Sequence, residues 1–361
     1  MKLRISALLP AALCLAAALF AATTRAAALP PFPEPATNVL RVAMLSDGGS
    51  FADNSFNQSC REGLESLLYA GAPLFVQFYE PLGTEDFALQ MGAFAERGYR
   101  LVIGIGYLMK SPLLRTARAY PDTFFVGVDT PLPNPPRNLR VLSFQVDECA
   151  FPAGYLAAAW AVMQDPKDPA VAWIGGRDVE SVNQFVVGFV NGVEHYNRVK
   201  RKNVRILGRH VGTFTDTAVA GRVAETFLDD GADVLFPVAG AAGTAAIRAA
   251  HERGKWAIGV DTDQYYMLPV EGKCLLTSCL KRMDRAVRAA VQATLEYQFW
   301  GGTHYVGNLQ NHGIGLAPFH EFESQIPLSL KRELQDIQRA ILNRKIDTGW
   351  PPPNTPAPET P

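Results

Sequence analysis

The stretch TPLPNPPRNLRVLSFQVDECAFPAG, residues 130–154, interrupts an otherwise regular pattern along the chain. Four prolines between Thr130 and Arg137 exclude a regular helix or strand there, because proline has no backbone N–H to donate. The RVLSFQVD portion that follows predicts an extended crossing. We interpret Gln145–Asp147 as the passage from one lobe of the protein to a second.

On both sides of this passage, apolar runs of strand length alternate with amphipathic helical patterns. The strands are predicted at 39–45, 74–79, 101–105, 123–128, 170–174, 204–211, 234–238, 256–260 and 274–280. The helices are predicted at 58–69, 87–97, 111–119, 153–163, 181–196, 219–229, 244–253 and 283–300. This alternation favours parallel sheets that are covered by helices on both faces. Two such lobes place a cleft at the carboxyl ends of their strands, where ligands bind in these folds.

The first 28 residues have the pattern of a secretory signal peptide. Lys2 and Arg4 precede an apolar stretch, and small residues follow up to Ala28. A membrane anchor is the alternative, but the apolar stretch is short for a span. A lipid-anchored Cys14 is disfavoured, because the bulky Leu13 stands where a lipoprotein signal has a small residue. We therefore expect an exported protein that is cleaved near Ala28.

The net charge and the cysteine spacing narrow the classes of function that the protein can have. Removing the three basic residues of the signal changes the formal net charge from −1 to −4, which leaves no basic footprint for nucleic acid. Four cysteines remain, and they form no C-x-x-C pair: Cys60, Cys149, Cys274 and Cys279. Export permits a disulfide among them but does not require one. The proline-rich segment 346–361 is predicted to be a disordered tail.

Polar residues, together with one glycine, recur at the ends of the predicted strands, just before the helices. They are Asp47, Asp129, Gly240, Asp261, Asp263 and Lys281. Each alone has an ordinary interpretation as a helix cap, a turn former or a solvated lysine, and Phe236 alone would be a core residue. Their common position favours a polar cleft. The six histidines never form H-E-x-x-H, and neither a G-x-S-x-G elbow nor a phosphate loop occurs, so we expect no catalytic residue, metal or cofactor.

Three segments resemble a known family. They are DGGSFADNSFNQSCREGLE (47–65), FPVAGAAGTAAIRAAHERGKWAIGVDTDQ (236–264) and LLTSCLKRMDRAV (275–287). Together they are similar to the basic membrane protein family, the purine nucleoside receptors of bacterial ABC importers. The resemblance implies an α/β fold, a two-lobed type I periplasmic binding protein with a mostly parallel sheet in each lobe and three hinge crossings. The implied N-terminal lobe is 39–146 plus 262–304, and the C-terminal lobe is 147–261 plus 305–345.

The resemblance also implies a role for each polar or aromatic residue of the cleft. Phe56 stacks on one face of a nucleobase, Asp47 and Asn57 add polar contacts, and Asp129 reads the purine edge. Phe236 covers the opposite face of the base from the second lobe. Asp263 and Lys281, with the turn at Gly240, bind the ribose. A carboxylate accepts but does not donate, so Asp129 would select ligands with N–H groups at that edge.

The chain departs from the family pattern on the sugar side, where GAAGTAA replaces a run of glycines and an asparagine after Gly240. A free nucleobase or riboflavin is therefore an alternative ligand. A nucleoside hydrolase is the rival class, supported only by Asp261-x-Asp263. A DNA-binding regulator would need helices where the signal peptide lies. The resemblance favours a monomeric periplasmic receptor that binds a nucleoside and delivers it to an ABC transporter permease, without a lipid anchor and without nucleic acid.

Overall fold

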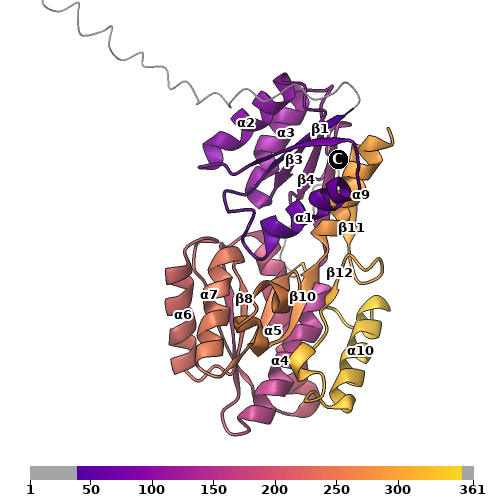
Figure 1. Cartoon of the computed structure of the whole chain (residues 1–361). Helices are drawn as coiled ribbons and strands as arrows, with labels where there is room; N and C mark the ends of the chain where they lie inside the picture. The colour runs from indigo at the N-terminus through magenta and orange to yellow at the C-terminus, as the bar shows by residue number, and fades with distance from the viewer. Residues whose placement is uncertain (1–38, 352–361) are drawn as a thin grey trace, which may run out of the picture. The chain divides into compact units, whose positions relative to one another are not determined.

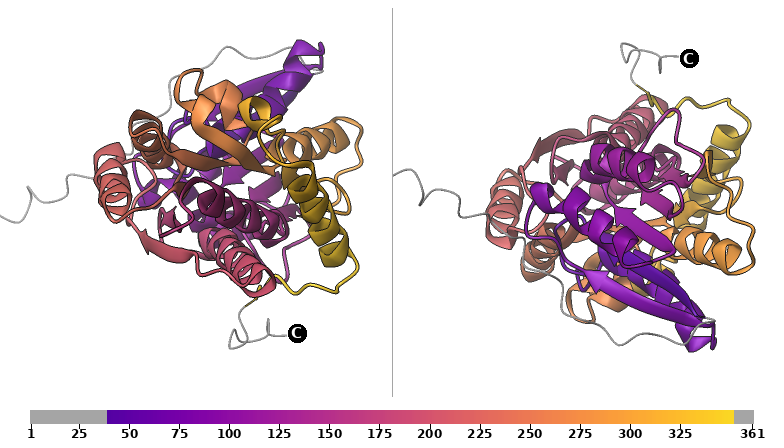
Figure 2. Two further views of the ribbon diagram at one scale, coloured as in Figure 1. Left: turned by 90° about the horizontal axis from the view of Figure 1, so that it is seen from below. Right: turned by 90° about the horizontal axis from the view of Figure 1, so that it is seen from above.

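A computed structural model describes residues 39–351, and two six-stranded sheets organise this part of the chain (Figure 1). Each sheet, with the helices that cover it, forms one lobe. The views along the sheets show helices on both faces of each (Figure 2). The α/β two-lobed fold predicted from the alternating pattern is confirmed.

The N-terminal lobe is built on an all-parallel sheet with the strand order β11-β5-β4-β3-β1-β2. Its central strand β3 buries every residue, because helices α1 and α9 pack over one face and α2 and α3 over the other. Its elements are β1 (Leu40–Leu45), α1 (Phe56–Tyr69), β2 (Leu74–Tyr79), α2 (Thr84–Glu96), β3 (Leu101–Ile105), the 3-10 helix η1 (Tyr107–Met109), α3 (Lys110–Ala119), β4 (Phe124–Val128), β5 (Leu139–Phe144), α9 (Met283–Leu295) and β11 (Thr303–Gly307).

The C-terminal lobe has the strand order β12-β10-β9-β8-β6-β7, in which only β12 runs antiparallel among the described strands. Helices α4 and α5 pack together on one face, and α6 and α7 on the other. Its elements are α4 (Asp147–Gln164), β6 (Ala170–Gly175), α5 (Glu180–Lys200), β7 (Arg205–His210), α6 (Thr217–Asp229), β8 (Val234–Val238), α7 (Gly240–Glu252), β9 (Trp256–Asp261), α8 (Gln264–Met267), the 3-10 helices η2 (Glu271–Cys274) and η3 (His320–Phe322), β10 (Leu275–Lys281), β12 (Ile314–Leu316) and α10 (Leu328–Leu342).

The chain passes between the lobes three times: from β5 to α4, from β10 to α9, and from β11 to β12. Backbone hydrogen bonds tie the crossings together. Gln145 N donates to Gly307 O at 2.8 Å, and Arg282 N donates to Gly313 O at 2.9 Å. The three predicted crossings are therefore present, and they run side by side.

The predicted lobe boundaries need correction after Asp261. Segment 262–281 was assigned to the N-terminal lobe, but β10 pairs with β9 inside the second sheet. The short helix α8 returns the chain to its own sheet, and the true crossing is at Arg282. Segment 305–307 likewise belongs to β11, hence to the N-terminal lobe. The segment interpreted as an extended crossing contains strand β5.

The start of the predicted disordered tail is ordered. Thr348 is buried, its carbonyl accepts a 2.8 Å hydrogen bond from Asn191 Nδ2, and its hydroxyl donates to Asp147 at the first turn of α4. Residues 352–361 and the predicted signal peptide lie outside the described part of the chain. All four cysteines within 39–351 are free thiols in buried positions. No helix in this range has the length and apolar character needed to cross a membrane.

Candidate ligand-binding site

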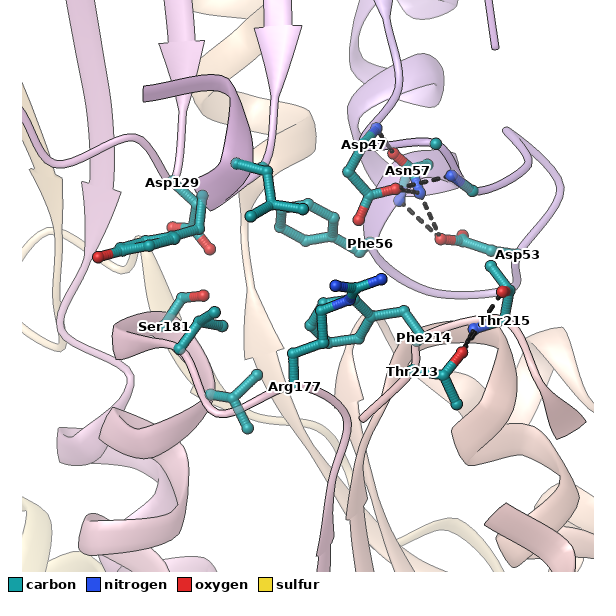
Figure 3. A pocket seen from close by; sticks show the side chains of 18 of the residues that line it. Asp47, Asp53, Phe56, Asn57, Asp129, Arg177, Ser181, Thr213, Phe214 and Thr215 are labelled. Atoms are coloured by element: carbon teal, nitrogen blue, oxygen red, sulfur yellow. Dashed lines mark hydrogen bonds between the residues drawn. The ribbon is translucent and has the colours of Figure 1, made fainter. Parts of the chain in front are cut away.

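A cavity of about 460 Å³ lies between the carboxyl ends of the strands of both sheets (Figure 3). Its volume is within the range of small-molecule sites. Six of the eight predicted site residues line it, namely Asp47, Phe56, Asn57, Asp129, Gly240 and Lys281. Phe236 and Asp263 do not line it.

The loop after β1 leads into the start of α1, which presents Phe56 and Asn57 to this cavity. Asp53 holds the loop, because its carboxylate accepts from the backbone N–H groups of Ser55, Asn57 and Gln58 at 3.0, 2.9 and 3.1 Å. A carboxylate at this place also complements the positive end of the helix dipole. The Asn57 amide donates to Asp53 at 3.0 Å and to Asp47 at 2.9 Å, so its orientation is fixed.

Phe51 in this loop and Phe56 at the start of α1 have different functions. Phe51 is buried and packs edge-on against Phe78 at a centroid distance of 5.2 Å, so it anchors the loop to the sheet. Phe56 lines the cavity instead. Burial raises the pKa of the nearby Asp47, whose carboxylate also accepts from Gly49 N at 3.0 Å.

Asp129 and Lys281, which both line the cavity, form a buried ion pair, although the family resemblance implied that one contacts the base and the other the sugar. Asp129 follows β4 in the N-terminal lobe, and Lys281 ends β10 in the C-terminal lobe. The Lys281 ammonium also lies 5.0 Å from the ring centroid of Phe56 and 5.8 Å from that of Phe185, within cation–π range. The pair therefore joins the lobes through two residues that line the cavity.

Asp261, and not Asp263, is the aspartate that the end of β9 turns toward the cavity. Its backbone is left-handed, with φ of 68°, and Asp129 at the corresponding strand end has φ of 57°. Such a conformation is strained for a non-glycine residue and recurs at functional positions. Desolvation raises the pKa of Asp261 to about 6, although Lys281 and the Ser55 hydroxyl lower it. Asp263 pairs with His320 at 2.8 Å instead.

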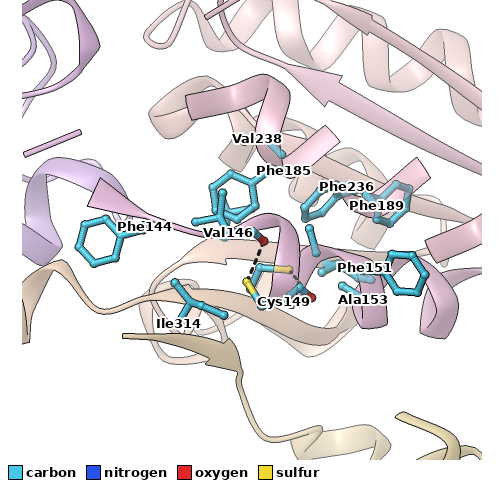
Figure 4. Close-up of a cluster of buried hydrophobic side chains, with 14 of the residues drawn as sticks. Phe144, Val146, Cys149, Phe151, Ala153, Phe185, Phe189, Phe236, Val238 and Ile314 are labelled. Carbon is cyan, nitrogen blue, oxygen red and sulfur yellow. Dashed lines mark hydrogen bonds between the residues drawn. The ribbon is translucent and has the colours of Figure 1, made fainter. Parts of the chain in front are cut away.

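Phe236 is a core residue and cannot close over a ligand. It is fully buried in the middle of β8 and stacks on Phe189 of α5 at a centroid distance of 4.5 Å (Figure 4). The aromatic residues that the C-terminal lobe presents to the cavity are Phe185 and Phe214. Phe56 and Phe214 point into the cavity from opposite lobes (Figure 3).

Phe214 and Arg177 are lining residues that the sequence interpretation missed. Both follow strand ends, Arg177 after β6 and Phe214 after β7. The strand-end pattern that identified Asp47 and Asp129 could have found them, had it been applied to these two strands as well.

Two sheets joined by three crossings, with a polar and aromatic cavity between the strand ends, define a type I periplasmic binding protein. The sequence model of one family, described as ABC transporter substrate-binding protein PnrA-like, matches residues 40–349. The chain therefore belongs to this family of ABC transporter substrate-binding proteins, and the family resemblance inferred from the sequence is confirmed.

Individual relatives agree with the family assignment. The chain is 27% identical over 327 residues to the ABC transporter nucleoside-binding protein BmpA of Lactococcus lactis subsp. cremoris, covering 85% of this chain and 86% of the relative. It is 26% identical to basic membrane protein A1 of Borrelia garinii subsp. bavariensis, covering 86% and 88%. A crystal structure of a solute-binding protein of an ABC transporter system from Aeropyrum pernix superposes with a TM-score of 0.78 at 24% identity, covering 85% of this chain and 92% of that one.

Proposed function

We propose that this protein binds a nucleoside, with a purine as its base, in the interlobe cavity and delivers it to the permease of an ABC importer from the periplasm. The observation that carries the proposal is the pair Phe56 and Phe214, which line one cavity from the two lobes. A planar base between two aromatic rings gains about 1–3 kcal/mol from stacking on each. The nucleoside-binding relative supports the same ligand class.

The polar groups of the cavity suit the rest of a nucleoside. Asp129 and Asp261 offer carboxylate oxygens, and Lys281 offers N–H donors, at the ends of β4, β9 and β10. Ribose hydroxyls and base N–H groups donate to carboxylates, and ribose oxygens accept from an ammonium. In this proposal Asp129 contacts the base, and Asp261 takes the sugar-side place that the family resemblance implied for Asp263.

Mass spectrometry of the small molecule released from the purified protein tests the proposal, together with calorimetric titration of inosine, adenosine, hypoxanthine and riboflavin. We expect an intact purine nucleoside to co-purify and to bind more tightly than the free base or the flavin. Tighter binding of hypoxanthine or riboflavin would show that this compound, and not a nucleoside, is the ligand. Recovery of free base and ribose after incubation with inosine would instead identify a hydrolase.

A further inference from the structure

Arg177 is an exposed residue that lines the cavity and has no assigned role. It follows β6, the strand between β8 and β7 in the C-terminal sheet, and it lines the cavity together with Phe214. Its side chain extends toward the space between Phe56 and Phe214 (Figure 3). A guanidinium is planar and carries five N–H donors and no acceptor. A ligand stacked on the two aromatic rings can therefore bond to it only through hydrogen-bond acceptors.

The backbone next to Arg177 fixes its place relative to the Phe214 ring. A Cβ at Gly176 would lie 2.4 Å from two carbons of that ring, so the ring packs directly on the backbone of Gly176. Gly176 N donates to Val238 O at 2.8 Å, and Val179 N donates to Arg177 O at 3.0 Å. These contacts place the backbone of Arg177 beside the ring on which a base would stack, and the exposed side chain can reach a ligand there.

The donors of Arg177 are available to a ligand. Lys281 and Arg177 are the two basic residues that line the cavity within the described part of the chain, and Lys281 is paired with Asp129. The lining carboxylates of Asp47 and Asp261 accept from Gly49, Asn57 and Ser55. Over residues 39–351, the Arg177 guanidinium takes part in no ion pair or side-chain hydrogen bond.

We propose that Arg177 determines specificity by selecting nucleosides whose base carries hydrogen-bond acceptors at the edge beside Phe214, which means 6-oxopurines over 6-aminopurines. The inference rests on the proposed function and deepens it. The rings of Phe56 and Phe214 would cover the two faces of a base held between them. Only the atoms along the edge of the base would then be accessible to other side chains. The carbonyl oxygen O6 and the five-membered-ring nitrogen N7 of a 6-oxopurine accept two N–H groups of one guanidinium, whereas the 6-amino group of an aminopurine points a donor at a donor.

Calorimetric titration with inosine, adenosine and inosine 5′-monophosphate tests this assignment on three proteins: wild type, Arg177→Met and Arg222→Met. Methionine keeps much of the side-chain length but removes the donors. Arg222 is an exposed arginine of α6 outside the cavity, so it controls for the loss of one positive charge from the same lobe. A thermal unfolding scan of each protein establishes that all three are folded.

We expect wild type to bind inosine about ten- to a hundred-fold more tightly than adenosine. Arg177→Met should lose most of this preference by weakening inosine while leaving adenosine within about two-fold, the scatter expected for a surface change. Arg222→Met should behave as wild type. Equal weakening of both nucleosides would assign Arg177 to stacking or to the sugar, and would overturn the proposal. An unchanged preference for inosine over adenosine in Arg177→Met would also overturn the proposal. So would a loss of affinity for inosine 5′-monophosphate alone, because it would indicate that Arg177 contacts the phosphate.

The same titrations separate this inference from the function on which it rests. If wild type binds neither nucleoside, the proposed function itself fails. If wild type binds both and their ratio does not depend on Arg177, nucleoside binding stands and only the selection by Arg177 is refuted.

Discussion

The Ser55 hydroxyl donates a hydrogen bond of 2.6 Å to Oδ2 of Asp261, and the two residues belong to opposite lobes. Two further contacts cross at the same place: Gln264 Nε2 donates to Asn54 O at 3.2 Å, and Gln58 Nε2 donates to Met267 Sδ at 3.4 Å. The start of α1 is therefore joined to the β9–α8 turn beside the cavity.

Asp261 should make the stability of the protein depend on pH. Burial raises its pKa to about 6, so between its ordinary pKa and about pH 6 the native state holds a proton that the unfolded chain has released. The contribution of this group to the free energy of unfolding therefore falls as the pH rises through that window, and stays low above it. We expect Asp261→Asn to raise the free energy of unfolding at about pH 7.5 by on the order of 2 kcal/mol, and to have little effect near pH 4. Urea unfolding of both proteins at the two pH values measures this, and a variant that is less stable than wild type at both would contradict it.

The buried pair of Asp129 and Lys281 should behave as one unit in folding. Removing one partner leaves the other charge buried and unpaired, which costs about 3–5 kcal/mol. We expect Asp129→Asn and Lys281→Met each to lower the free energy of unfolding strongly, and the double variant to lose less than the two single losses added together. Urea unfolding of the four proteins forms the double-mutant cycle. Additive losses would show that the two side chains do not interact.

The ion pair of Asp129 and Lys281 should also influence which nucleoside the protein prefers. The sequence interpretation gave Asp129 to the base and Lys281 to the ribose, with independent effects on the ligand profile. Because the two side chains are bonded to each other, each substitution also removes the bonding partner of the other side chain and lets it change position. Calorimetry of guanosine and adenosine should therefore show that Lys281→Met disturbs base preference as well as overall affinity. A uniform loss for both nucleosides would restore the independent roles.

Alanine variants of Phe56, Phe214 and Phe236 should separate effects on ligand affinity from effects on the free energy of unfolding. Phe56→Ala and Phe214→Ala each remove one stacking surface of the cavity, so nucleoside affinity should fall by roughly 1–3 kcal/mol. Phe236→Ala removes a fully buried ring, so the free energy of unfolding should fall by about 3–5 kcal/mol while the folded fraction still binds. Titration calorimetry and urea unfolding of the three variants check both halves. Unchanged affinity in either cavity variant would remove that ring from the stacking site.

The crossings at Gln145, Arg282 and 308–313 should act as a hinge. A ligand that touches both lobes favours the closed arrangement over a more open one, because it gains contacts only when the lobes approach. We expect the radius of gyration from small-angle X-ray scattering to decrease when saturating nucleoside is added. Superimposable curves with and without ligand would be evidence against hinge closure.

Hydrophobic pattern predicted one edge strand of each sheet, β2 and β7, but missed the other edge strand of each and took β5 for an extended crossing. The bounds of β2, β3 and β8 were predicted to the residue, because predominantly apolar runs of strand length identify them. Strands β11 and β12 were missed, since the first is largely exposed and the second has three residues. The pairing that places both in the sheets depends on distant segments, which a local pattern does not contain.

The errors in the site have a different origin. Phe236 lies within a strand, where successive side chains point to opposite faces, and it faces α5 rather than the cavity. Asp261 and Asp263 are two residues apart, and the left-handed backbone at Asp261 decides which carboxylate lines the cavity. Sequence pattern located the strand ends correctly, but side-chain direction within a turn depends on backbone angles that the pattern does not specify.

The three crossings also determine the order in which this chain can complete its fold during synthesis. The N-terminal lobe lacks α9 and the edge strand β11 until the chain has reached Gly307, although β1 to β5 emerge from the ribosome early. The C-terminal lobe in turn lacks α10 and the buried Thr348 until almost the last described residue has been made. Neither lobe can therefore complete its fold before Gly307 has been synthesised, so the nascent chain keeps unpaired strand edges and uncovered sheet faces until late.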